Sequence, residues 1–446
     1  MTSTAEMTTG TAPRSRLRPR WGGGGATGTA NALKEAVVGL ARRSYPLRYL
    51  GLMMICGILM KPSLVDESAS LAPLVKALTA AVFLGLVLAY LARGVALSAT
   101  LTLFILYRLA YLLPTLLNDG DLLNWGYASI AQVSVLMVIE LHVGAEEESR
   151  RRLLRVLTDL LLLYLMVNAA MILLGISKDA AAGAQFSQPS YLLGIRTRVT
   201  DTIFPAIMLA FLYDSTSSRR WGWRSIIAVG TGLLQIAFLH VATALVGTAI
   251  AAITYIVVAL RPHGRGLLSM RAVTVGGIAI TLLVVVARIH LLFTSLIEGT
   301  LGKSLTLTGR TDIWDAALPI LADSPLFGYG INHEFGRFAP GPDGGLWQAH
   351  NQYLQIMHDG GLLAVGLFLA LLWVASTRMD HSACDPRARA ALTAIYAAMS
   401  VMAVSEIYIY NMALFILIPF LASRVTELTG GERAAGTGAS ERRGAR

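Results

Sequence analysis

One segment contains side chains that could take part in catalysis. It reads Trp347-Gln-Ala-His-Asn-Gln-Tyr-Leu-Gln-Ile-Met-His358-Asp-Gly-Gly361. Helical periodicity predicts that one face of it consists of His350, Tyr353, Leu354 and Met357. Because this face continues into an apolar helix, we expect His350 at the outer membrane boundary. A neutral imidazole there is suited to act as a general base near pH 7. A hydrogen-bonded interfacial histidine fits the same pattern.

The second histidine of this segment, His358, follows His350 by about 12 Å along a helix. The two histidines are therefore too far apart to bind one metal ion from the same helix face. The segment also lacks a His-Glu-x-x-His element, so we predict no metal site.

A second segment, Thr308-Gly-Arg-Thr-Asp-Ile-Trp-Asp-Ala-Ala-Leu-Pro-Ile-Leu-Ala322, predicts an amphipathic helix. Its apolar face consists of Ile313, Trp314, Ala317, Leu318, Leu321 and Ala322. Thr311 or Asp312 could cap its start, and Pro319 should bend it or end its first part. Arg310 lies at the helix N-terminus, where anions are favoured, and would make a pyrophosphate clamp. A salt bridge that ties the loop down is an equally good interpretation.

The chain continues with Pro325-Leu-Phe-Gly-Tyr-Gly330, a turn rich in glycine. Gly328 and Gly330 would allow the backbone to approach a neighbour closely, or to flex as a lid. An ordinary surface turn explains the same residues.

The elements that must position these segments are membrane spans. The chain has 446 residues, of which 55% are hydrophobic and only 14% are charged. These values exclude a soluble enzyme, a disulfide scaffold and a disordered protein. The net charge of +10 comes from short basic stretches between apolar segments. That distribution is typical of membrane topology and argues against a nucleic-acid partner.

We predict an all-α polytopic membrane protein with about 12 transmembrane helices and one large extracytoplasmic loop containing short helices. The predicted spans are 47–64, 71–92, 95–117, 122–142, 153–175, 200–215, 225–240, 242–260, 272–290, 361–377, 388–406 and 408–424. Placing both termini in the cytoplasm gives every cytoplasmic loop at least one arginine, whereas the external loop around Asn118–Asn124 is acidic.

The predicted membrane domain covers residues 45–428. Residues 1–44 are basic and rich in Ser, Thr and Gly, and we expect a disordered cytoplasmic N-terminus without a cleaved signal peptide. Residues 429–446 are expected to form a disordered cytoplasmic tail. Two longer loops, 176–199 and 291–360, face outward, and long loops in compact proteins are usually functional.

Arg108 lies well inside an apolar run. Burying it in the bilayer centre would cost about 2.5–3.5 kcal/mol, so it should face the bundle or a wet cavity. It could extend a diphosphate site, or it could snorkel or pair internally with Asp159 or Glu406. His240 and Gln235 are interpreted as structural polar contacts.

Three motifs occur in order in the large loop: Gly309-Arg310-x-x-x-Trp314, Pro325-Leu-Phe-Gly-Tyr-Gly330 and His350-Asn-Gln-Tyr-Leu354. Together with the topology, they resemble the O-antigen ligase and O-antigen/exopolysaccharide polymerase superfamily. The close resemblance covers about 60 residues.

The resemblance implies a metal-independent, inverting glycosyltransferase without a cofactor, which acts outside the bacterial inner membrane. The donor would be a glycan on a polyprenyl diphosphate such as undecaprenyl diphosphate, and the acceptor a hydroxyl of a glycan, lipid or protein. His350 would be the general base, and Arg310 would bind the diphosphate. The shorter outer loop would supply Arg196 or Arg198, and Asn351, Trp314, Gly328 and Gly330 would support the loop.

A transporter or flippase for a polysaccharide precursor is the main alternative. It would be expected to show an internal repeat and ionisable residues near the midplane, whereas the polar residues of this chain concentrate in the outer loops. A non-catalytic scaffold for envelope assembly is a third hypothesis.

Overall fold

The computed structural model describes residues 45–179, 188–216, 222–260, 268–289, 309–334, 336–341, 345–408 and 416–429. The N-terminus predicted over 1–44, and nearly all of the predicted tail, lie outside these residues. Contacts divide the chain into a unit of residues 1–50 and a unit of residues 51–446. The second unit carries the histidine, arginine and glycine motifs.

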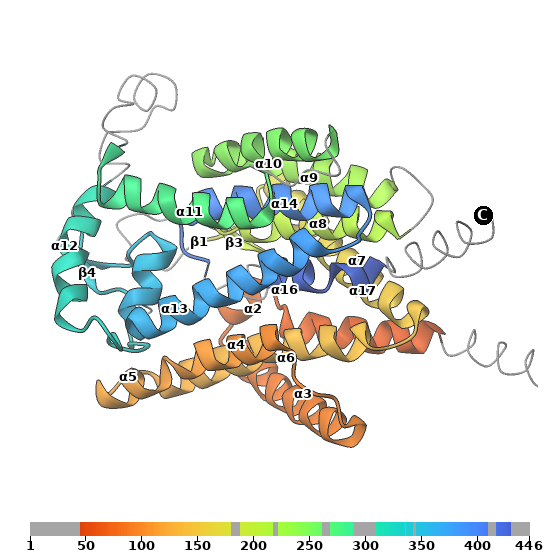
Figure 1. Ribbon diagram of the computed structural model, residues 1–446, viewed down its shortest axis with the longest axis horizontal. Helices are drawn as coiled ribbons and strands as arrows, with labels where there is room; N and C mark the ends of the chain where they lie inside the picture. Colours follow the sequence, from red (N-terminus) through yellow and green to blue (C-terminus); the bar gives the residue numbers. More distant parts are fainter. Residues whose placement is uncertain are drawn as a thin grey trace, which may run out of the picture. The chain divides into compact units, whose positions relative to one another are not determined.

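The described chain is mostly helical (Figure 1). After a helix over Tyr45–Leu59, the helices are α2 (Ser63–Asp66), α3 (Leu71–Arg93), α4 (Ala99–Leu109), α5 (Leu112–Leu117), α6 (Leu122–Val143), α7 (Glu147–Leu173), α8 (Thr200–Ser215), α9 (Trp223–Leu239), α10 (Ala242–Leu260), α11 (Met270–Val285), α12 (Arg310–Asp323), α13 (Gln352–His381), α14 (Pro386–Met402), α16 (Leu417–Ser423) and α17 (Val425–Thr429).

This is a multi-pass membrane protein. Six of the described helices are long and apolar enough to cross a bilayer, namely Leu71–Arg93, Ala99–Leu117, Leu122–Val143, Glu147–Leu173, Ala242–Leu260 and Gln352–His381. Each predicted span up to 388–406 overlaps a described helix. The last predicted span, 408–424, falls partly outside the described residues, and the count of about 12 stays a prediction.

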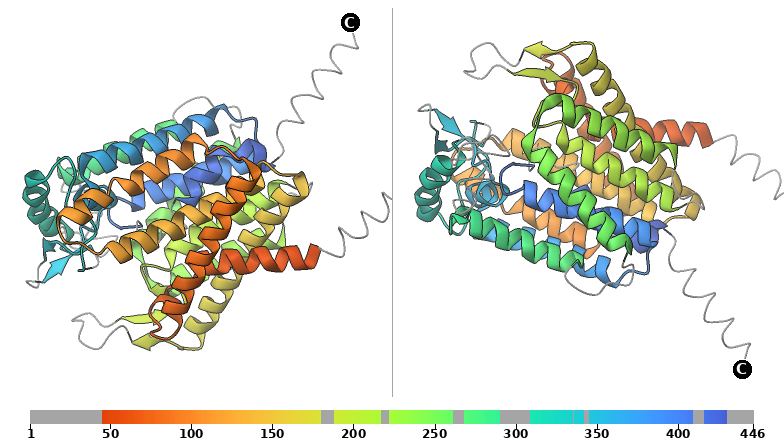
Figure 2. Two further views of the ribbon diagram at one scale, coloured as in Figure 1. Left: turned by 90° about the horizontal axis from the view of Figure 1, so that it is seen from below. Right: turned by 90° about the horizontal axis from the view of Figure 1, so that it is seen from above.

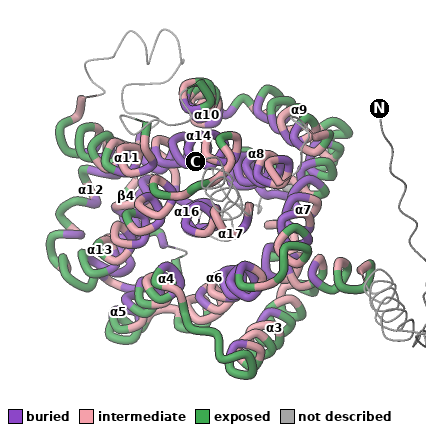
Figure 3. The backbone as a smooth tube through the Cα atoms, turned by 45° about the vertical axis from the view of Figure 1, so that its right-hand side comes forward, coloured by how far each residue is buried: buried purple, intermediate pink, exposed green. Residues whose placement is uncertain are grey.

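Helix α14 lies in the middle of the bundle and packs against α8, α10 and α11 (Figures 1 and 3). Its sequence is rich in alanine, and nearly all of its residues are buried. Small side chains let neighbouring backbones approach closely, which is how membrane helices pack without a hydrophobic driving force between them. Gly247 of α10 meets Met402, and Gly277 of α11 meets Ser400, at such close approaches.

Helix α13 begins nine residues before the predicted span 361–377 and is kinked at Gly361, where φ is 61°. The residues before the kink carry the histidine motif into the membrane domain. The stretch after it packs against α4, α11 and α16. The kink therefore separates a short segment near the loop from a long apolar span.

Two small antiparallel sheets form in the loops 176–199 and 291–360, so the mostly helical protein contains a little strand that the sequence analysis did not predict. The shorter loop contains β1 (Lys178–Asp179), β2 (Pro189–Tyr191) and β3 (Gly194–Ile195), paired in that order, with Ser190 opposite Ile195. In the large loop, β4 (Ala339–Pro340) pairs with β5 (Leu346–Trp347). Strands this short carry no alternating apolar pattern, so periodicity could not reveal them.

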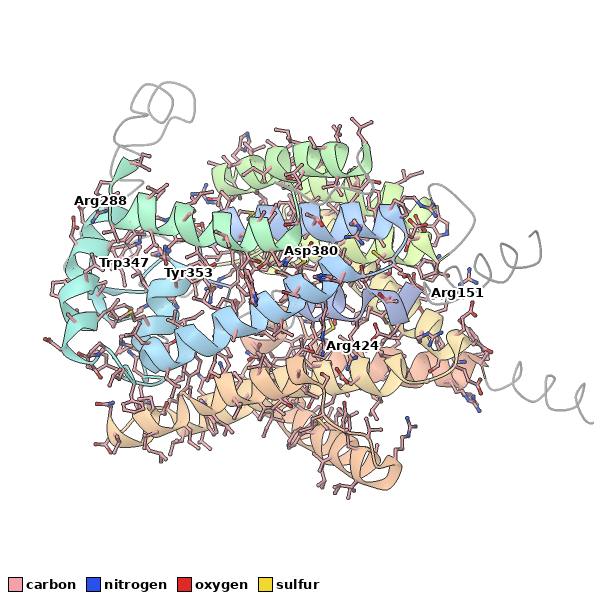
Figure 4. The ribbon with its side chains drawn as sticks, viewed as in Figure 1. Arg151, Arg288, Trp347, Tyr353, Asp380 and Arg424 are labelled. Atoms are coloured by element: carbon pink, nitrogen blue, oxygen red, sulfur yellow. The ribbon has the colours of Figure 1, made fainter. Side chains whose placement is uncertain are left out.

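The unit of residues 51–446 has two distinct ends. Helix α12, strand β4 and the start of α13 lie together at one end, where Arg288, Trp347 and Tyr353 are also found (Figures 2 and 4). Arg151 and Arg424 lie at the other end (Figure 4). The loop motifs and the most basic loops are thus separated by the length of the bundle.

Candidate active site

Helix α12 places Arg310 at its first position. The helix starts after Gly309, whose φ of 82° is readily adopted only by glycine, and no side chain caps it. The predicted caps Thr311 and Asp312 are therefore wrong, because the N-cap position is Gly309, two residues before Thr311. Pro319 lies inside the helix without ending it.

The apolar face of α12 packs into the loop as predicted, apart from its edge. Ile313, Trp314, Ala317 and Leu321 are buried, and they form a cluster with residues of β4 and α13. Leu318 and Ala322, which we assigned to the same face, are exposed. The face is therefore narrower than the periodicity suggested, and α12 is an integral part of the loop core.

His350 is held just outside α13 in a strained conformation. Its φ is 45°, a value that is uncommon for a residue other than glycine. The predicted helical stripe is therefore wrong for His350, although Leu354 and Met357 do lie on the helix. Asn351 is the N-cap, and its side-chain oxygen accepts the backbone N–H groups of Tyr353 and Leu354. A cap must leave helical geometry, so the asparagine next to His350 was the signal for this helix start.

The segment that follows α14 is hydrogen-bonded directly to this motif. The Asn351 side chain donates to the backbone oxygen of Val404 over 2.9 Å, and the Gln352 N–H donates to that of Ala403 over 2.9 Å. These bonds place Glu406 and Ile407, which come shortly after Val404 in the chain, at the same end of the bundle as His350.

Arg310, Arg198 and Glu406 converge around His350. Arg310 donates to the Glu406 carboxylate over 2.7 Å, and Arg198 donates to the backbone oxygen of Ile407 over 3.0 Å. Thr243, in the first turn of α10, lies 3.5 Å from the same carboxylate. Segments that are far apart in the sequence thus meet at one point.

The electrostatics of the cluster act on the imidazole. Burial, above all, and the positive charge of Arg310 lower the pKa of His350 to about 4. The Glu406 carboxylate opposes this shift, and Arg198 adds a further lowering. His350 is therefore neutral at pH 7 and can accept a proton. The same interactions show that all three charged groups lie close enough to influence it.

The glycine motif packs against the kink of α13. The backbone oxygens of Pro325 and Leu326 accept the N–H groups of Leu362 and Leu363, which the kink at Gly361 removes from the helix ladder. A Cβ atom at Gly328 would lie 2.3 Å from the backbone oxygen of His358. Of the three interpretations of this motif, close backbone approach is confirmed.

Residues 227–369 match the family model described as O-Antigen ligase. This part of the chain is similar to the O-antigen ligase family. The resemblance that the three loop motifs carried is thereby confirmed, because the match includes α12 and the segment around His350. Arg198 and Glu406 lie outside it.

One curated relative is the exopolysaccharide production protein ExoQ of Rhizobium meliloti (strain 1021). It is 32% identical over 130 residues, which is 27% of this chain and 28% of that protein. The match therefore spans little more than a quarter of the relative. No solved structure is similar to the chain.

Among the described contacts, neither Arg196 nor Arg108 is bonded to the cluster around His350. Arg196 is exposed and is not among the charged groups that act on His350, whereas Arg198 is. Arg108 is buried in α4, donates to Ser129 over 3.0 Å and lies over the Tyr111 ring. The expected pairing of Arg108 with Asp159 or Glu406 is wrong, since Asp159 pairs with Arg224 and Glu406 with Arg310.

Sequence reasoning missed Glu406 as a member of this site and considered it only as a partner for Arg108. A signal was available, because Glu406 ends the predicted span 388–406 on the side opposite Arg387 and Arg389. An acidic residue at the outer end of an apolar span needs a cation nearby. Nothing in the sequence indicated which arginine this would be.

Proposed function

We propose that the protein is an extracytoplasmic membrane glycosyltransferase that moves a glycan from a polyprenyl diphosphate to an acceptor hydroxyl. The reaction is inverting and metal-independent. The observation that carries this proposal is the convergence of a neutral, half-buried imidazole with two guanidinium groups at one end of a membrane bundle. Similarity of the matched region to the O-antigen ligase family supports the same reaction class.

Arg310 and Arg198 bind the diphosphate of the donor. A guanidinium group can donate two parallel hydrogen bonds to a phosphate, and Arg310 adds the positive end of the α12 dipole. Negative charge develops on the diphosphate oxygen as the glycosidic bond breaks, and preorganised donors stabilise such charge most effectively. Arg310 at the start of α12 and Arg198 just before α8 therefore supply the charge compensation that a metal ion supplies in other enzymes.

His350 acts as the general base. The acceptor oxygen attacks the anomeric carbon while the imidazole takes the proton of the acceptor hydroxyl. The bond between the anomeric carbon and the diphosphate oxygen breaks, and its electron pair leaves with the diphosphate. Attack from the face opposite the leaving group inverts the anomeric centre.

The charges of the cluster connect donor binding to base strength. The arginines lower the pKa of His350 before the donor is bound, so that the base is neutral but weak. A diphosphate bound to Arg310 and Arg198 offsets their positive charge and raises the pKa of His350. Glu406 holds Arg310 through one ion pair, and its negative charge opposes binding of the donor diphosphate at the remaining N–H groups. The base thus becomes strong only when a donor is present.

The cluster faces the periplasmic side of the inner membrane, and both termini are cytoplasmic. This orientation is supported by Arg151 and Arg424 at the opposite end of the bundle (Figure 4), because cytoplasmic loops collect basic residues. The acceptor is a glycan, lipid or protein hydroxyl. The relative named as an exopolysaccharide production protein favours a glycan acceptor and hence chain extension.

The test is to incubate the purified protein with a defined polyprenyl-diphosphate glycan and to measure the size of the products. A ladder of sizes indicates a polymerase, and a single addition to another acceptor indicates a ligase. We expect His350→Ala to reduce the rate by about 10²–10⁴-fold, the usual contribution of a general base. Full activity of a folded His350→Ala protein would overturn the proposed mechanism.

A further inference from the structure

Both backbone polar groups of Ala349, the residue before His350, are hydrogen-bonded to buried side chains. The indole N–H of Trp314 donates to the Ala349 backbone oxygen over 2.9 Å. On the other side, the Ala349 N–H donates to the side-chain oxygen of Gln355 over 3.2 Å. Ala349, Trp314 and Gln355 are fully buried, so these bonds form away from solvent.

The bonds oppose a conformational cost at the next residue. A residue other than glycine with φ near 45° is disfavoured, because its Cβ approaches the following carbonyl oxygen. Such strain persists only where the surroundings fix the backbone. At His350 the backbone is fixed on one side by the hydrogen bonds of the Ala349 N–H and C=O groups. On the other side it is fixed by the N-cap residue Asn351.

The Gln355 amide is itself oriented by an acidic residue. Its nitrogen donates to the Asp359 carboxylate over 3.0 Å and to the backbone oxygen of Gly336 over 3.1 Å. Because both partners only accept hydrogen bonds, the amide must turn its oxygen toward the Ala349 N–H. His358 donates to the same carboxylate over 2.8 Å and stacks on the Phe338 ring.

We propose that Gln355 is a positioning residue for His350. Together with Trp314 it fixes the backbone of Ala349, and this orients the imidazole of His350 toward Arg310 and Arg198. Asp359 fixes the direction of the Gln355 amide, and His358 anchors Asp359. The second histidine of the motif is thus part of the support for the first. This inference rests on the proposed role of His350 as the base.

The main variant is Gln355→Met, which keeps the length of the side chain and removes both hydrogen-bonding ends. Asp359→Asn is the second variant, since a neutral amide no longer forces the orientation of Gln355. Gln235→Met is the matched control. Gln235 is also buried and bridges Asn168 and the Leu165 backbone oxygen, far along the chain from the His350 loop.

Kinetics distinguish misplacement of the base from loss of folded protein. We expect Gln355→Met to lower kcat by about 10- to 100-fold. The donor KM should change by less than about twofold, because Arg310 and Arg198 are untouched. A displaced imidazole also leaves its half-buried place beside the arginines. Its pKa then rises from about 4 toward the ordinary value, and the acid limb of kcat/KM moves to higher pH.

A measurement that does not depend on activity follows the imidazole itself. The rate at which diethyl pyrocarbonate modifies His350, read by mass spectrometry, should rise in Gln355→Met and, to a smaller extent, in Asp359→Asn. It should stay at the wild-type value in Gln235→Met. If Gln355→Met does not yield folded protein, the same two measurements on Asp359→Asn decide the question.

The outcomes separate this inference from the proposed function. An inactive His350→Ala together with wild-type kcat, pH profile and modification rate in Gln355→Met would overturn the positioning role and leave the function intact. A fully active His350→Ala would overturn the function. In that case the modification rate alone tests whether Gln355 positions His350. An unchanged rate in Gln355→Met would show that it does not.

Discussion

Arginines at the two ends of the bundle are bonded in different ways. At the end that carries Arg151 and Arg424, Arg424 reaches both oxygens of Glu140 over 2.8 Å and also contacts Glu427. Arg224 likewise makes two bonds to Asp159, over 2.6 Å and 3.1 Å. These pairs join α6 to the segment after α16, and α9 to α7.

The cluster around His350 commits far less of its donor capacity. Among the described residues, Arg310 makes a single ion pair, to Glu406. Arg198 donates to one backbone oxygen and forms a longer ion pair with Asp201 over 3.9 Å. A guanidinium group has five N–H donors, so both arginines can still bind an anion. The comparison teaches that the residue type does not distinguish a structural arginine from a binding one. The number of donors already used does.

Among the arginine variants, removal of Arg310 should cause the largest loss of activity. We expect Arg310→Ala to lower kcat/KM for the lipid-linked donor by about 10²–10³-fold, because a preorganised donor to the leaving group is lost. Arg310→Lys should recover only part of the rate, since the bidentate fork is absent. The measurement is initial rate against donor concentration with the reconstituted protein.

Arg271→Ala serves as the control at an arginine outside the cluster around His350. Arg271 pairs with Asp380, which also accepts the first N–H groups of α11 and so keeps partners in the variant. Activity of the folded control should stay within about twofold of wild type. Equal losses in Arg271→Ala and Arg310→Ala would remove the distinction between the cluster and arginines outside it.

The second effect compares two arginines of one short loop. Arg198→Ala should reduce kcat/KM by at least about 10-fold, as expected for losing a hydrogen bond to a charged group. Arg196→Ala should leave it unchanged, because Arg196 is exposed and does not act on His350. A larger loss of kcat/KM in Arg196→Ala than in Arg198→Ala would indicate that the donor does not bind beside the Ile407 backbone.

A smaller effect should follow from Glu406→Gln. Because Glu406 pairs with the arginine that the donor needs, removing its charge should lower the donor KM by about two- to fivefold. The measurement is donor saturation at constant pH, with Thr243→Val as a control that changes a neighbour of the carboxylate without changing charge. A higher KM in Glu406→Gln would mean that the carboxylate helps to bind the donor.

The spans and the outer loops were predictable because their signals are local. A run of apolar residues specifies a membrane helix wherever it packs, and Arg310 at the start of α12 followed from helical periodicity alone. Asn351 could also have been recognised as a cap. The departure of His350 from the helix follows from that cap, so this error lay in extending the periodicity one residue too far.

The rest of the site depends on contacts between distant segments, which spacing does not encode. Arg198 meets Ile407, and Arg310 meets Glu406, only because α8 and α12 begin where α14 ends. Nothing near Arg196 or Arg198 in the sequence could choose between them. The support of Ala349 by Gln355 is likewise invisible, since it depends on a backbone N–H left outside the helix.

The glycine motif offers the smallest and most local test, because it shapes the loop without touching the charged cluster. Gly328 has φ of 68°, and a Cβ there would lie 2.3 Å from the His358 backbone oxygen, so Gly328→Ala must shift the backbone. We expect a loss of about 1–2 kcal/mol in stability from the conformation alone. The measurement is the thermal unfolding midpoint in detergent.

Gly366→Ala is the matched control, because a Cβ at this helical position of α13 meets nothing within 4 Å. Alanine is the better helix former, so this variant should keep or slightly raise the unfolding midpoint. If Gly328→Ala were as stable as Gly366→Ala, the motif would not need to approach the α13 kink closely. The N–H groups of Leu362 and Leu363 would then have to be satisfied in another way, since a span cannot leave them unbonded at this depth.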